Sequence, residues 1–87
     1  MKVFLHPKAA DYLQRCSESQ RIRIKHRLGE LEDQPEKKGE RLKHSPFYSL
    51  RIGDYRAIFM IDQANDQVVV LFIGHRKDVY DDFDKLF

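Results

Sequence analysis

The stretch "YSLRIGDYRAIF", residues 48–59, contains the turn on which the fold of this chain depends. Apolar and polar residues alternate on both sides of Gly53-Asp54, a pattern typical of two antiparallel strands joined by a tight hairpin. Glycine followed by a polar residue matches the two central positions of a type II′ turn. In that register Arg51 lies directly opposite Arg56. Like charges in such a pair are destabilising, so the pair requires an explanation.

The same register sorts the side chains of the hairpin onto two faces, because successive residues of a strand point to opposite sides of a sheet. One face is apolar and predicts the core side of the hairpin. It collects Tyr48, Leu50, Ile52, Tyr55, Ala57 and Phe59. The two arginines share the other face, which we expect to be partly open.

Length and composition indicate one globular domain over residues 1–87. The chain is 41% apolar and 34% charged, and it has no repeat and no low-complexity segment. Cys16 is its single cysteine, which excludes an intramolecular disulfide and fits a reducing compartment. The N-terminal apolar run is too short for a signal peptide, and no window suits a membrane span. We therefore expect a cytoplasmic protein without membrane partners.

Charge is distributed unevenly along the chain. Residues 1–60 contain 13 Lys and Arg against 8 Asp and Glu, whereas residues 61–87 contain 3 against 6. A basic majority followed by an acidic end suggests a surface that binds a polyanion, although short charge runs are more often simply solvated.

A strand and two helices are predicted before the hairpin. Residues 2–6 form a short strand candidate, and Pro7 then suits the first turn of a helix with an apolar stripe. Ser17-Glu18-Ser19-Gln20 has the form of a capping box and opens a second helix over about 18–33. Residues 34–46 are polar, contain two prolines and a glycine, and predict a loop.

A third strand and a last helix are predicted after the hairpin. "VVVLFI", residues 68–73, is apolar on both faces and therefore predicts a central strand. Asp78 is placed to cap a helix over about 79–86, whose packing residues are Val79, Phe83 and Leu86. The predicted fold class is α+β: a short N-terminal strand, a helical hairpin, a three-stranded antiparallel meander and a short C-terminal helix, with the helices against one sheet face.

Several kinds of active site find no support in the residues. His6, His26, His44 and His75 have no metal-ligand spacing and no neighbouring cysteine or carboxylate cluster. The chain shows no nucleophile elbow, no glycine-rich phosphate loop and no paired-carboxylate arrangement. We therefore expect neither a metal nor another cofactor.

A cationic site remains. Arg51 and Arg56 face each other, and Arg76 follows the end of the neighbouring strand. Gly74 removes a side chain from the same strand face and is expected to leave room for a ligand, while Tyr80 brings a phenol to the rim. Three guanidiniums on one concavity suit phosphate, because the planar fork of arginine donors matches it. The competing interpretation is that nearby aspartates neutralise them in ordinary surface ion pairs.

An RNA substrate would supply its own nucleophile, the 2′-hydroxyl beside the phosphodiester, which DNA lacks. Arginines would stabilise the charge that develops at phosphorus. Tyr80 and His75 are both candidates for the base, and the residues leave that choice open. Contacts to the RNA backbone are predicted for five more residues: Arg23 and Arg27 of the basic second helix, and Lys43, Ser49 and Lys77.

Residues 48–62, "YSLRIGDYRAIFMID", and residues 68–83, "VVVLFIGHRKDVYDDF", resemble the RelE family within the RelE/ParE toxin superfamily. The likeness covers nearly the whole chain. It implies the microbial RNase-like fold and a toxin of a type II toxin–antitoxin system. The implied activity is that of a ribosome-dependent endoribonuclease, which cuts mRNA at A-site codons by metal-free 2′-hydroxyl attack, leaves a 2′,3′-cyclic phosphate and inhibits translation. The implied partners are a RelB-type antitoxin and the ribosome with its mRNA.

The resemblance also implies roles for single residues. Arg51 and Arg56 match the basic residues of the family's paired strands. Arg76 matches the arginine after the last strand, and Tyr80 the C-terminal tyrosine. Ser49 departs from the pattern, since some members have a lysine there.

A second departure concerns the base. His75 occupies a position often held by lysine, and the stretch from Arg76 to Tyr80 is shorter than in the best-known bacterial type. The resemblance therefore leaves the base open between Tyr80 and His75.

Two alternative functions come from the same superfamily. A ParE-like toxin would inhibit DNA gyrase and cut nothing, and a degenerate member would only bind its antitoxin. Retention of all three arginines together with Tyr80 favours the nuclease.

Overall fold

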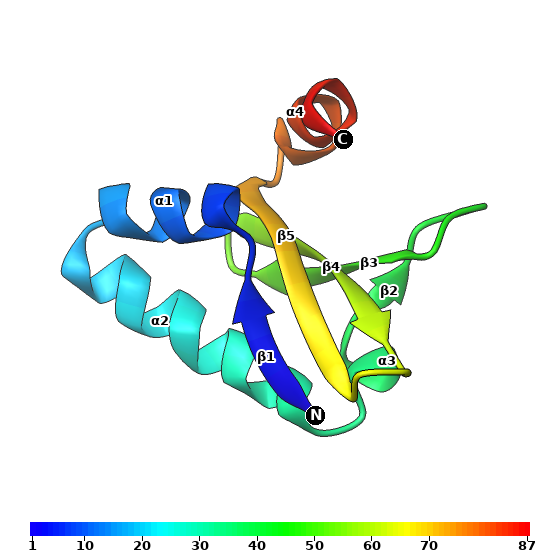
Figure 1. Ribbon diagram of the computed structural model, residues 1–87. Helices are drawn as coiled ribbons and strands as arrows, with labels where there is room; N and C mark the ends of the chain where they lie inside the picture. The colour runs from blue at the N-terminus through cyan, green and yellow to red at the C-terminus, as the bar shows by residue number, and fades with distance from the viewer.

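A five-stranded mixed sheet forms the centre of the protein in the computed structural model, which describes residues 1–87 (Figure 1). The strands are β1 (Lys2–Leu5), β2 (Glu40–Arg41), β3 (Phe47–Ile52), β4 (Tyr55–Asp62) and β5 (Gln67–His75). Their order across the sheet is β1-β5-β4-β3-β2. β1 runs parallel to β5, and every other pair is antiparallel.

Helices cover the two faces of this sheet unequally. The helical segments are α1 (Pro7–Arg15), α2 (Glu18–Gly29), the 3₁₀ turn η1 (Glu30–Glu32), α3 (Pro35–Lys38) and α4 (Val79–Leu86). α1 and α2 form a hairpin on one side, called the helical face below (Figure 1). α4 follows the end of β5 and covers only part of the opposite side, called the open face. The prediction that helices lie against one face alone is therefore wrong for α4.

The hairpin register predicted from the sequence is confirmed. Arg51 pairs with Arg56 and Ile52 pairs with Tyr55, which leaves Gly53-Asp54 as a two-residue loop. Gly53 has φ of +61°, the left-handed region that a type II′ turn requires at its first central position. The backbone of the turn therefore needs glycine at this position, and the turn holds the pairing of β3 and β4 in one register.

The predicted core face is also confirmed. Leu50, Ile52, Ala57 and Phe59 are fully buried beneath α1 and α2, together with Ile24, Leu28 and Leu31 from the segment after the first helix. Tyr48 and Tyr55 lie half-buried at the margin of this cluster.

The capping box that begins α2 is formed as predicted. The Ser17 hydroxyl accepts from the Gln20 amide, and the Gln20 side chain accepts from the Ser17 amide. The helix ends at Gly29, however, and residues 30–32 continue as a 3₁₀ turn, so the predicted span of 18–33 contains two elements.

β5 occupies an interior position between β1 and β4, as its apolar faces predicted. A bulge interrupts its pairing with β4, since Ile58 pairs with Phe72 and Phe59 pairs with Val70. Leu71 is the extra residue, and both Leu71 and Phe72 contact the apolar cluster of the open face. The bulge thus supplies two apolar residues in succession to the surface on which α4 lies.

The C-terminal helix has its predicted bounds but not all of its predicted contacts. Val79 and Phe83 are buried against Ile58 and Leu71. Leu86 is 48% exposed and does not belong to the core, and the Asp78 side chain makes no capping hydrogen bond. Two buried side chains therefore hold α4 on the sheet.

The segment 34–46 is not a simple loop. It contains the single turn α3 and the two-residue strand β2, in which Glu40 pairs with Ser49. Gly39 allows this edge to lie close, because a Cβ there would stand 2.8 Å from the Phe59 ring and 3.0 Å from the Ser49 carbonyl oxygen. Elements this short carry no readable periodicity, and β1 pairs with a strand more than sixty residues away. For both reasons the sequence predicted three paired strands where the sheet has five.

We expect Leu50→Ala to lower the free energy of unfolding by about 2–5 kcal/mol, because the side chain is 1% exposed and its loss leaves a cavity. Chemical denaturation measures this. Ile22→Ala is the control, since Ile22 is 61% exposed and its truncation should change stability by no more than about 0.5 kcal/mol. Equal stability of the two variants would contradict the assigned core face.

Candidate active site

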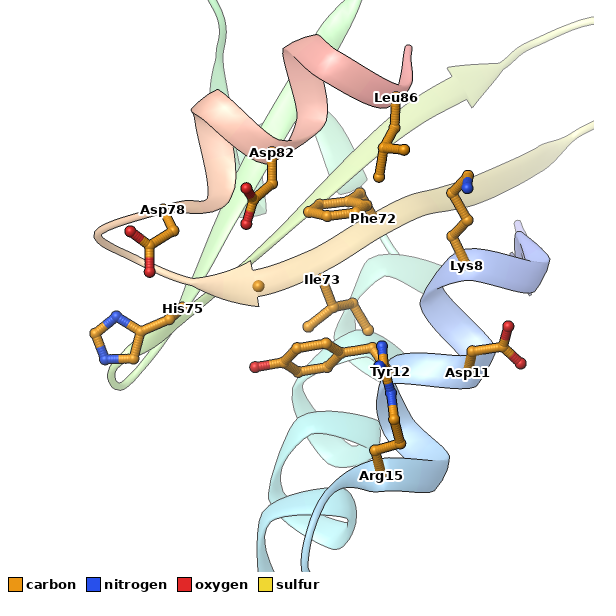
Figure 2. Close-up of a pocket in the computed structure, with 11 residues that line it drawn as sticks. Lys8, Asp11, Tyr12, Arg15, Phe72, Ile73, His75, Asp78, Asp82 and Leu86 are labelled. Carbon is orange, nitrogen blue, oxygen red and sulfur yellow. The ribbon is translucent and has the colours of Figure 1, made fainter.

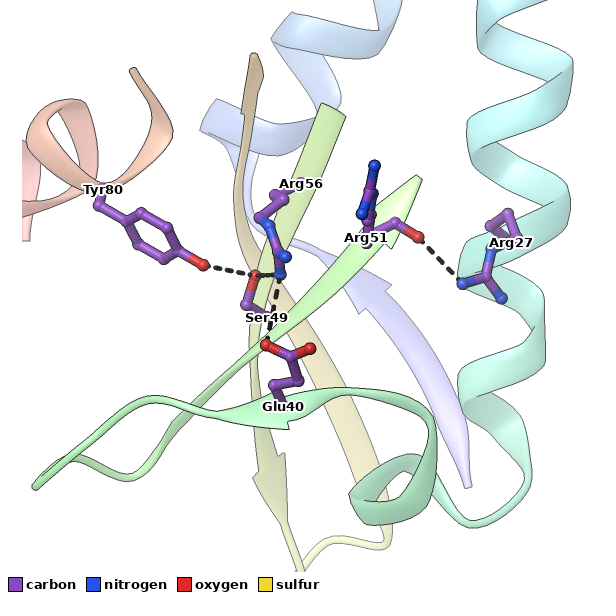
Figure 3. Close-up of polar contacts among 6 residues, drawn as sticks. All are labelled: Arg27, Glu40, Ser49, Arg51, Arg56 and Tyr80. Carbon is purple, nitrogen blue, oxygen red and sulfur yellow. Dashed lines mark hydrogen bonds and ion pairs between the residues drawn. The ribbon is translucent and has the colours of Figure 1, made fainter. Parts of the chain in front are cut away.

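Four polar side chains from four elements meet on the open face of the sheet (Figure 3). They are Glu40 of β2, Ser49 of β3, Arg56 of β4 and Tyr80 of α4. The Ser49 hydroxyl is at the centre, where it accepts from Arg56 Nη1 at 3.0 Å and from the Tyr80 hydroxyl at 3.2 Å. The site therefore exists only in the folded sheet with α4 in place.

Arg56 is the one cation of this group, and its position is fixed by two contacts. Its side chain is 18% exposed, and its Nη1 lies 3.9 Å from Glu40 Oε2. Glu40 is itself 79% exposed and stands at the edge of the sheet. One guanidinium is thus fixed between a buried hydroxyl and a solvent-facing carboxylate, which positions its other donors for an anion.

Glu40 was not among the site residues predicted from the sequence. Nothing in the polar run of residues 34–46 marks it, because β2 has only two residues. Its pairing with Ser49 is what brings its carboxylate beside Arg56. In the sequence Glu40 is simply a glutamate between a glycine and an arginine, and that pattern is not specific for any site.

The opposed arginines predicted from the hairpin point in different directions. Figure 3 shows Arg56 turned toward Ser49 and Glu40, whereas the side chain of Arg51 extends away from them. The Arg51 side chain is exposed and makes no hydrogen bond or ion pair. Divergence of the two side chains, and the carboxylate beside one of them, reduces the like-charge repulsion.

Arg76 and Lys77 lie in the turn between β5 and α4, and both side chains are exposed. The Arg76 amide donates to the Asp54 carbonyl at 2.8 Å, which ties this turn to the loop of the β3–β4 hairpin. No hydrogen bond or ion pair connects either side chain to Arg56. The backbone brings Arg76 close to the hairpin loop, and the grouping of three guanidiniums around one anion stays a prediction.

His75 is on the wrong side of the sheet for the role of base. It pairs with Tyr55, and Gly74 pairs with Arg56, so alternation along β5 directs His75 to the helical face. Its ring contacts the Tyr55 ring with centroids 6.0 Å apart, and its Nδ1 accepts from the Lys77 amide at 3.3 Å. The sequence-based choice between Tyr80 and His75 could not detect this separation without the register of β5.

Gly74 does not leave room for a ligand as predicted. The residue is buried, and a Cβ added to it would stand 3.3 Å from a methyl group of Val79 and 3.4 Å from the Phe72 ring. The missing side chain allows α4 to lie close to β5 instead.

His75 lines a separate cleft of about 430 Å³ between α1, the end of β5 and α4 (Figure 2). Lysine and arginine side chains come from α1, and Asp78 and Asp82 from the C-terminal segment. Tyr12 forms part of the wall, and burial raises the pKa of its phenol, with smaller contributions from Cys16 and Tyr55. Charges of both signs line this cleft, so it does not select for an anion.

Two of the basic side chains on α2, those of Arg21 and Arg27, bind other groups of the protein. Arg21 donates to the carbonyls of Leu13, Gln14 and Cys16 at the end of α1. Arg27 binds Glu30 at 2.9 Å and donates to the Arg51 carbonyl at 2.9 Å (Figure 3).

The guanidinium of Arg23 lies against Gly53, where a Cβ would stand 2.7 Å from its Nη2. The structure thus gives Arg27 intramolecular partners, while Arg23 is exposed beside the hairpin turn. Of the two predicted RNA contacts on α2, only Arg23 keeps an unpaired guanidinium.

Lys43 lies near Tyr80 of the site, although the two residues are far apart in the sequence. It lines a cleft of about 450 Å³ between the segment 42–47 and α4, to which Tyr80, Phe83 and Phe87 also contribute. Lys43 and Tyr80 therefore share a surface. Ser49, by contrast, is 1% exposed, and its hydroxyl accepts from Arg56 and Tyr80.

Two further observations concern metal binding and membrane spans. The structure contains no group of three His, Cys, Asp or Glu side chains placed to hold a metal ion. None of its helices is long and apolar enough to cross a membrane.

A comparison with family models matches residues 3–80 to the ParE toxin of type II toxin–antitoxin systems, parDE. The chain belongs to this toxin family. It is therefore a type II toxin of the RelE/ParE superfamily, and the resemblance found in the sequence is confirmed at that level. No curated protein matched the chain.

Solved structures of RelE toxins share the fold of this ParE-family toxin. The RelBE2 toxin–antitoxin complex of Mycobacterium tuberculosis matches at 26% identity and a TM-score of 0.76, over 86% of this chain and 96% of that chain. The archaeal RelE–RelB complex of Pyrococcus horikoshii matches at 23% identity and 0.72, over 86% and 93%. The isolated E. coli RelE toxin matches at 18% identity and 0.74, over 98% and 96%. The predicted fold class is confirmed by these matches.

We expect Arg27→Gln to raise the pKa of the Glu30 carboxyl toward its ordinary value. The hydrogen bond from Arg27 is the main cause that holds this pKa below its usual range. Because the folded pKa is the lower one, the pair stabilises the fold above the unfolded pKa, and the effect is lost as pH falls through the folded pKa. Exposure to solvent keeps the effect small and salt-dependent.

An NMR titration of the Glu30 carboxyl carbon measures this shift. Arg15→Gln on α1 is the control and should leave the Glu30 titration unchanged. An unchanged titration in Arg27→Gln would mean that Arg27 is free to contact RNA as the sequence analysis expected.

Proposed function

We propose that this toxin is a metal-free endoribonuclease that cuts mRNA in the ribosomal A site and so inhibits translation. The observation that carries the proposal is the convergence of Arg56, Tyr80 and Glu40 around the Ser49 hydroxyl. These three groups supply a fixed cation, a proton donor and a carboxylate base on one open surface. A phosphodiester with an adjacent 2′-hydroxyl needs these three functions for cleavage.

In the proposed reaction the Glu40 carboxylate takes the proton of the 2′-hydroxyl, and the 2′-oxygen attacks phosphorus. The bond from phosphorus to the 5′-oxygen breaks, and the Tyr80 phenol gives its proton to that oxygen. The products are a 2′,3′-cyclic phosphate and a 5′-hydroxyl. Arg56 stabilises the charge that develops on the nonbridging oxygens. Water then returns a proton to Tyr80 and removes one from Glu40.

Glu40 replaces both predicted candidates, Tyr80 and His75, as the base in this scheme. An ionised carboxylate accepts protons and donates none, and Glu40 is exposed beside Arg56. Tyr80 is a neutral phenol that is 38% exposed beside Arg56, so it has a proton that it can turn from Ser49 to the leaving oxygen. Arg56 keeps its predicted role, and Tyr80 changes from a candidate base to the acid. Arg51, Arg76, Lys43 and Arg23 are proposed to contact the RNA backbone around the site.

In this proposal the ribosome holds and orients the mRNA, which the small surface of the toxin does not do alone. The candidate site is shallow, and exposed arginines and lysines give electrostatic affinity with little reading of sequence. Binding in the A site would hold one codon against Arg56 and orient the 2′-oxygen in line with the leaving group. The resemblance of residues 48–62 and 68–83 to the RelE family supports this choice of substrate, because it implies ribosome-dependent cleavage.

An antitoxin of the RelB type is the proposed protein partner. Several matched structures are described as complexes of RelE with RelB, from a bacterium and from archaea. The resemblance implies an acidic helical chain that wraps the toxin, and the basic region of residues 1–60 is complementary to such a chain.

A second candidate function is inhibition of DNA gyrase without cleavage. The observation that favours it is the family description, which names the ParE toxin of parDE systems. In that case Arg56 and Tyr80 would be recognition or structural residues.

We expect Arg56→Ala to reduce cleavage of mRNA on programmed ribosomes by about 10²–10³-fold, because a fixed donor to the developing charge is lost. Primer extension maps the 5′ ends of the products. Arg15→Ala removes the same charge from α1 and should cut at the wild-type rate. Thermal melting of each variant checks the fold.

Cuts confined to the A-site codon would support the nuclease. Wild-type protein that leaves mRNA intact but blocks DNA supercoiling by gyrase would contradict it and favour the second candidate.

We expect Glu40→Gln to reduce the rate of cleavage by about 10²–10⁴-fold, the usual contribution of a general base. Glutamine preserves the shape of the side chain but cannot take the proton. Single-turnover cleavage across a pH series measures the loss. Glu36→Gln on the exposed surface of α3 is the control. If Glu40→Gln cuts as fast as the wild type, the base is another group, and Tyr80 becomes the next one to test.

A further inference from the structure

Ser49 is the only buried polar side chain in the protein, with an exposure of 1%. It stands on β3 between Glu40 of β2 and Ile58 of β4, which are its partners across the sheet. A hydroxyl buried beside apolar neighbours is costly unless it is hydrogen-bonded. The partners of its hydrogen bonds therefore indicate why a serine is present at this position.

Both hydrogen bonds of Ser49 Oγ come from the proposed catalytic residues. Arg56 Nη1 donates at 3.0 Å and the Tyr80 hydroxyl donates at 3.2 Å, which uses the two acceptor positions of a serine oxygen. The two donors belong to different elements, β4 and α4. One atom thus sets where the cation and the phenol lie relative to each other (Figure 3).

The bond from Tyr80 has a second consequence for α4. It is the only hydrogen bond between a side chain of α4 and the sheet, and the helix is otherwise held by Val79 and Phe83. Apolar contacts restrict the position of a helix but fix the rotation of an exposed side chain less tightly than a directed bond does. Tyr80 is 38% exposed and would have several rotamers without this acceptor.

We propose that Ser49 is a positioning residue, a shared acceptor that holds Arg56 and Tyr80 in the arrangement that cleavage requires. The inference rests on the proposed function. It replaces the prediction that Ser49 contacts RNA, because a side chain that is 1% exposed and lies behind its two donors is not accessible to a substrate. Ser49 acts on the reaction only through its two donors.

The test compares Ser49→Ala with Ser19→Ala, which makes the same change on the exposed surface of α2. Water can reach Arg56 and Tyr80, so Ser49→Ala should fold. NMR signals of the Arg56 guanidinium and the Tyr80 ring report their positions without RNA. Single-turnover cleavage on programmed ribosomes, with the toxin in varied excess, separates the maximal rate from apparent affinity.

We expect Ser49→Ala to shift both side-chain signals and to lower the maximal rate by about 10–100-fold, the effect of slight misplacement of reacting groups. Apparent affinity should stay within about threefold, because Ser49 does not touch the RNA. Ser19→Ala should behave as the wild type in every measurement.

Unchanged Arg56 and Tyr80 signals in Ser49→Ala would overturn the positioning role, whatever the activity. A shift of both signals with an unchanged rate would overturn it as well, because the arrangement would then not matter to cleavage. Wild-type protein that cuts no RNA would instead overturn the proposed function, and the side-chain signals would still show whether Ser49 holds the two donors.

Discussion

The two-residue turn at Gly53-Asp54 is the constraint on which the rest of the structure depends. Because side chains alternate along a strand, a slip of one residue in the β3–β4 pairing would exchange the core face with the open face. The left-handed conformation of Gly53 holds the register in which Leu50 and Ala57 face the helices. The same register places Ser49 and Arg56 together on the other side, so one turn determines both the core and the site.

On the open face, the directions of the side chains reduce the repulsion between Arg51 and Arg56, although both arginines keep their charge. Arg51 and Arg56 are direct neighbours, but their side chains diverge, and only Arg56 is held. Glu40 on the edge strand β2 forms an ion pair with Arg56. The Arg51 carbonyl accepts a hydrogen bond from the Arg27 guanidinium of α2. The result is one ordered guanidinium and one exposed guanidinium. An ordered donor costs little further entropy when charge develops near it, which suits catalysis better than a mobile cluster.

The proposed active arrangement depends on a helix that few contacts hold on the sheet. α4 contributes Tyr80 but is held on the sheet by two buried side chains and one hydrogen bond. Segments with few buried contacts are the first to open in a folded protein. A partner that moved α4 would therefore separate the phenol from Arg56 without disturbing the main core beneath α1 and α2.

The sequence by itself determined the hairpin, its register, the core face, the capping box of α2 and the family resemblance. Each of these depends on residues that are close together in the chain. It also predicted Arg56 and Tyr80 as site residues, which the structure brings to one hydroxyl. It did not determine β2, the parallel pairing of β1, or the side of the sheet on which His75 lies. Those features arise when distant segments meet, and a two-residue strand has no periodicity to read. Only the tertiary structure placed Glu40 beside Arg56 and made Ser49 the acceptor for both donors, because those contacts join residues of four separate elements.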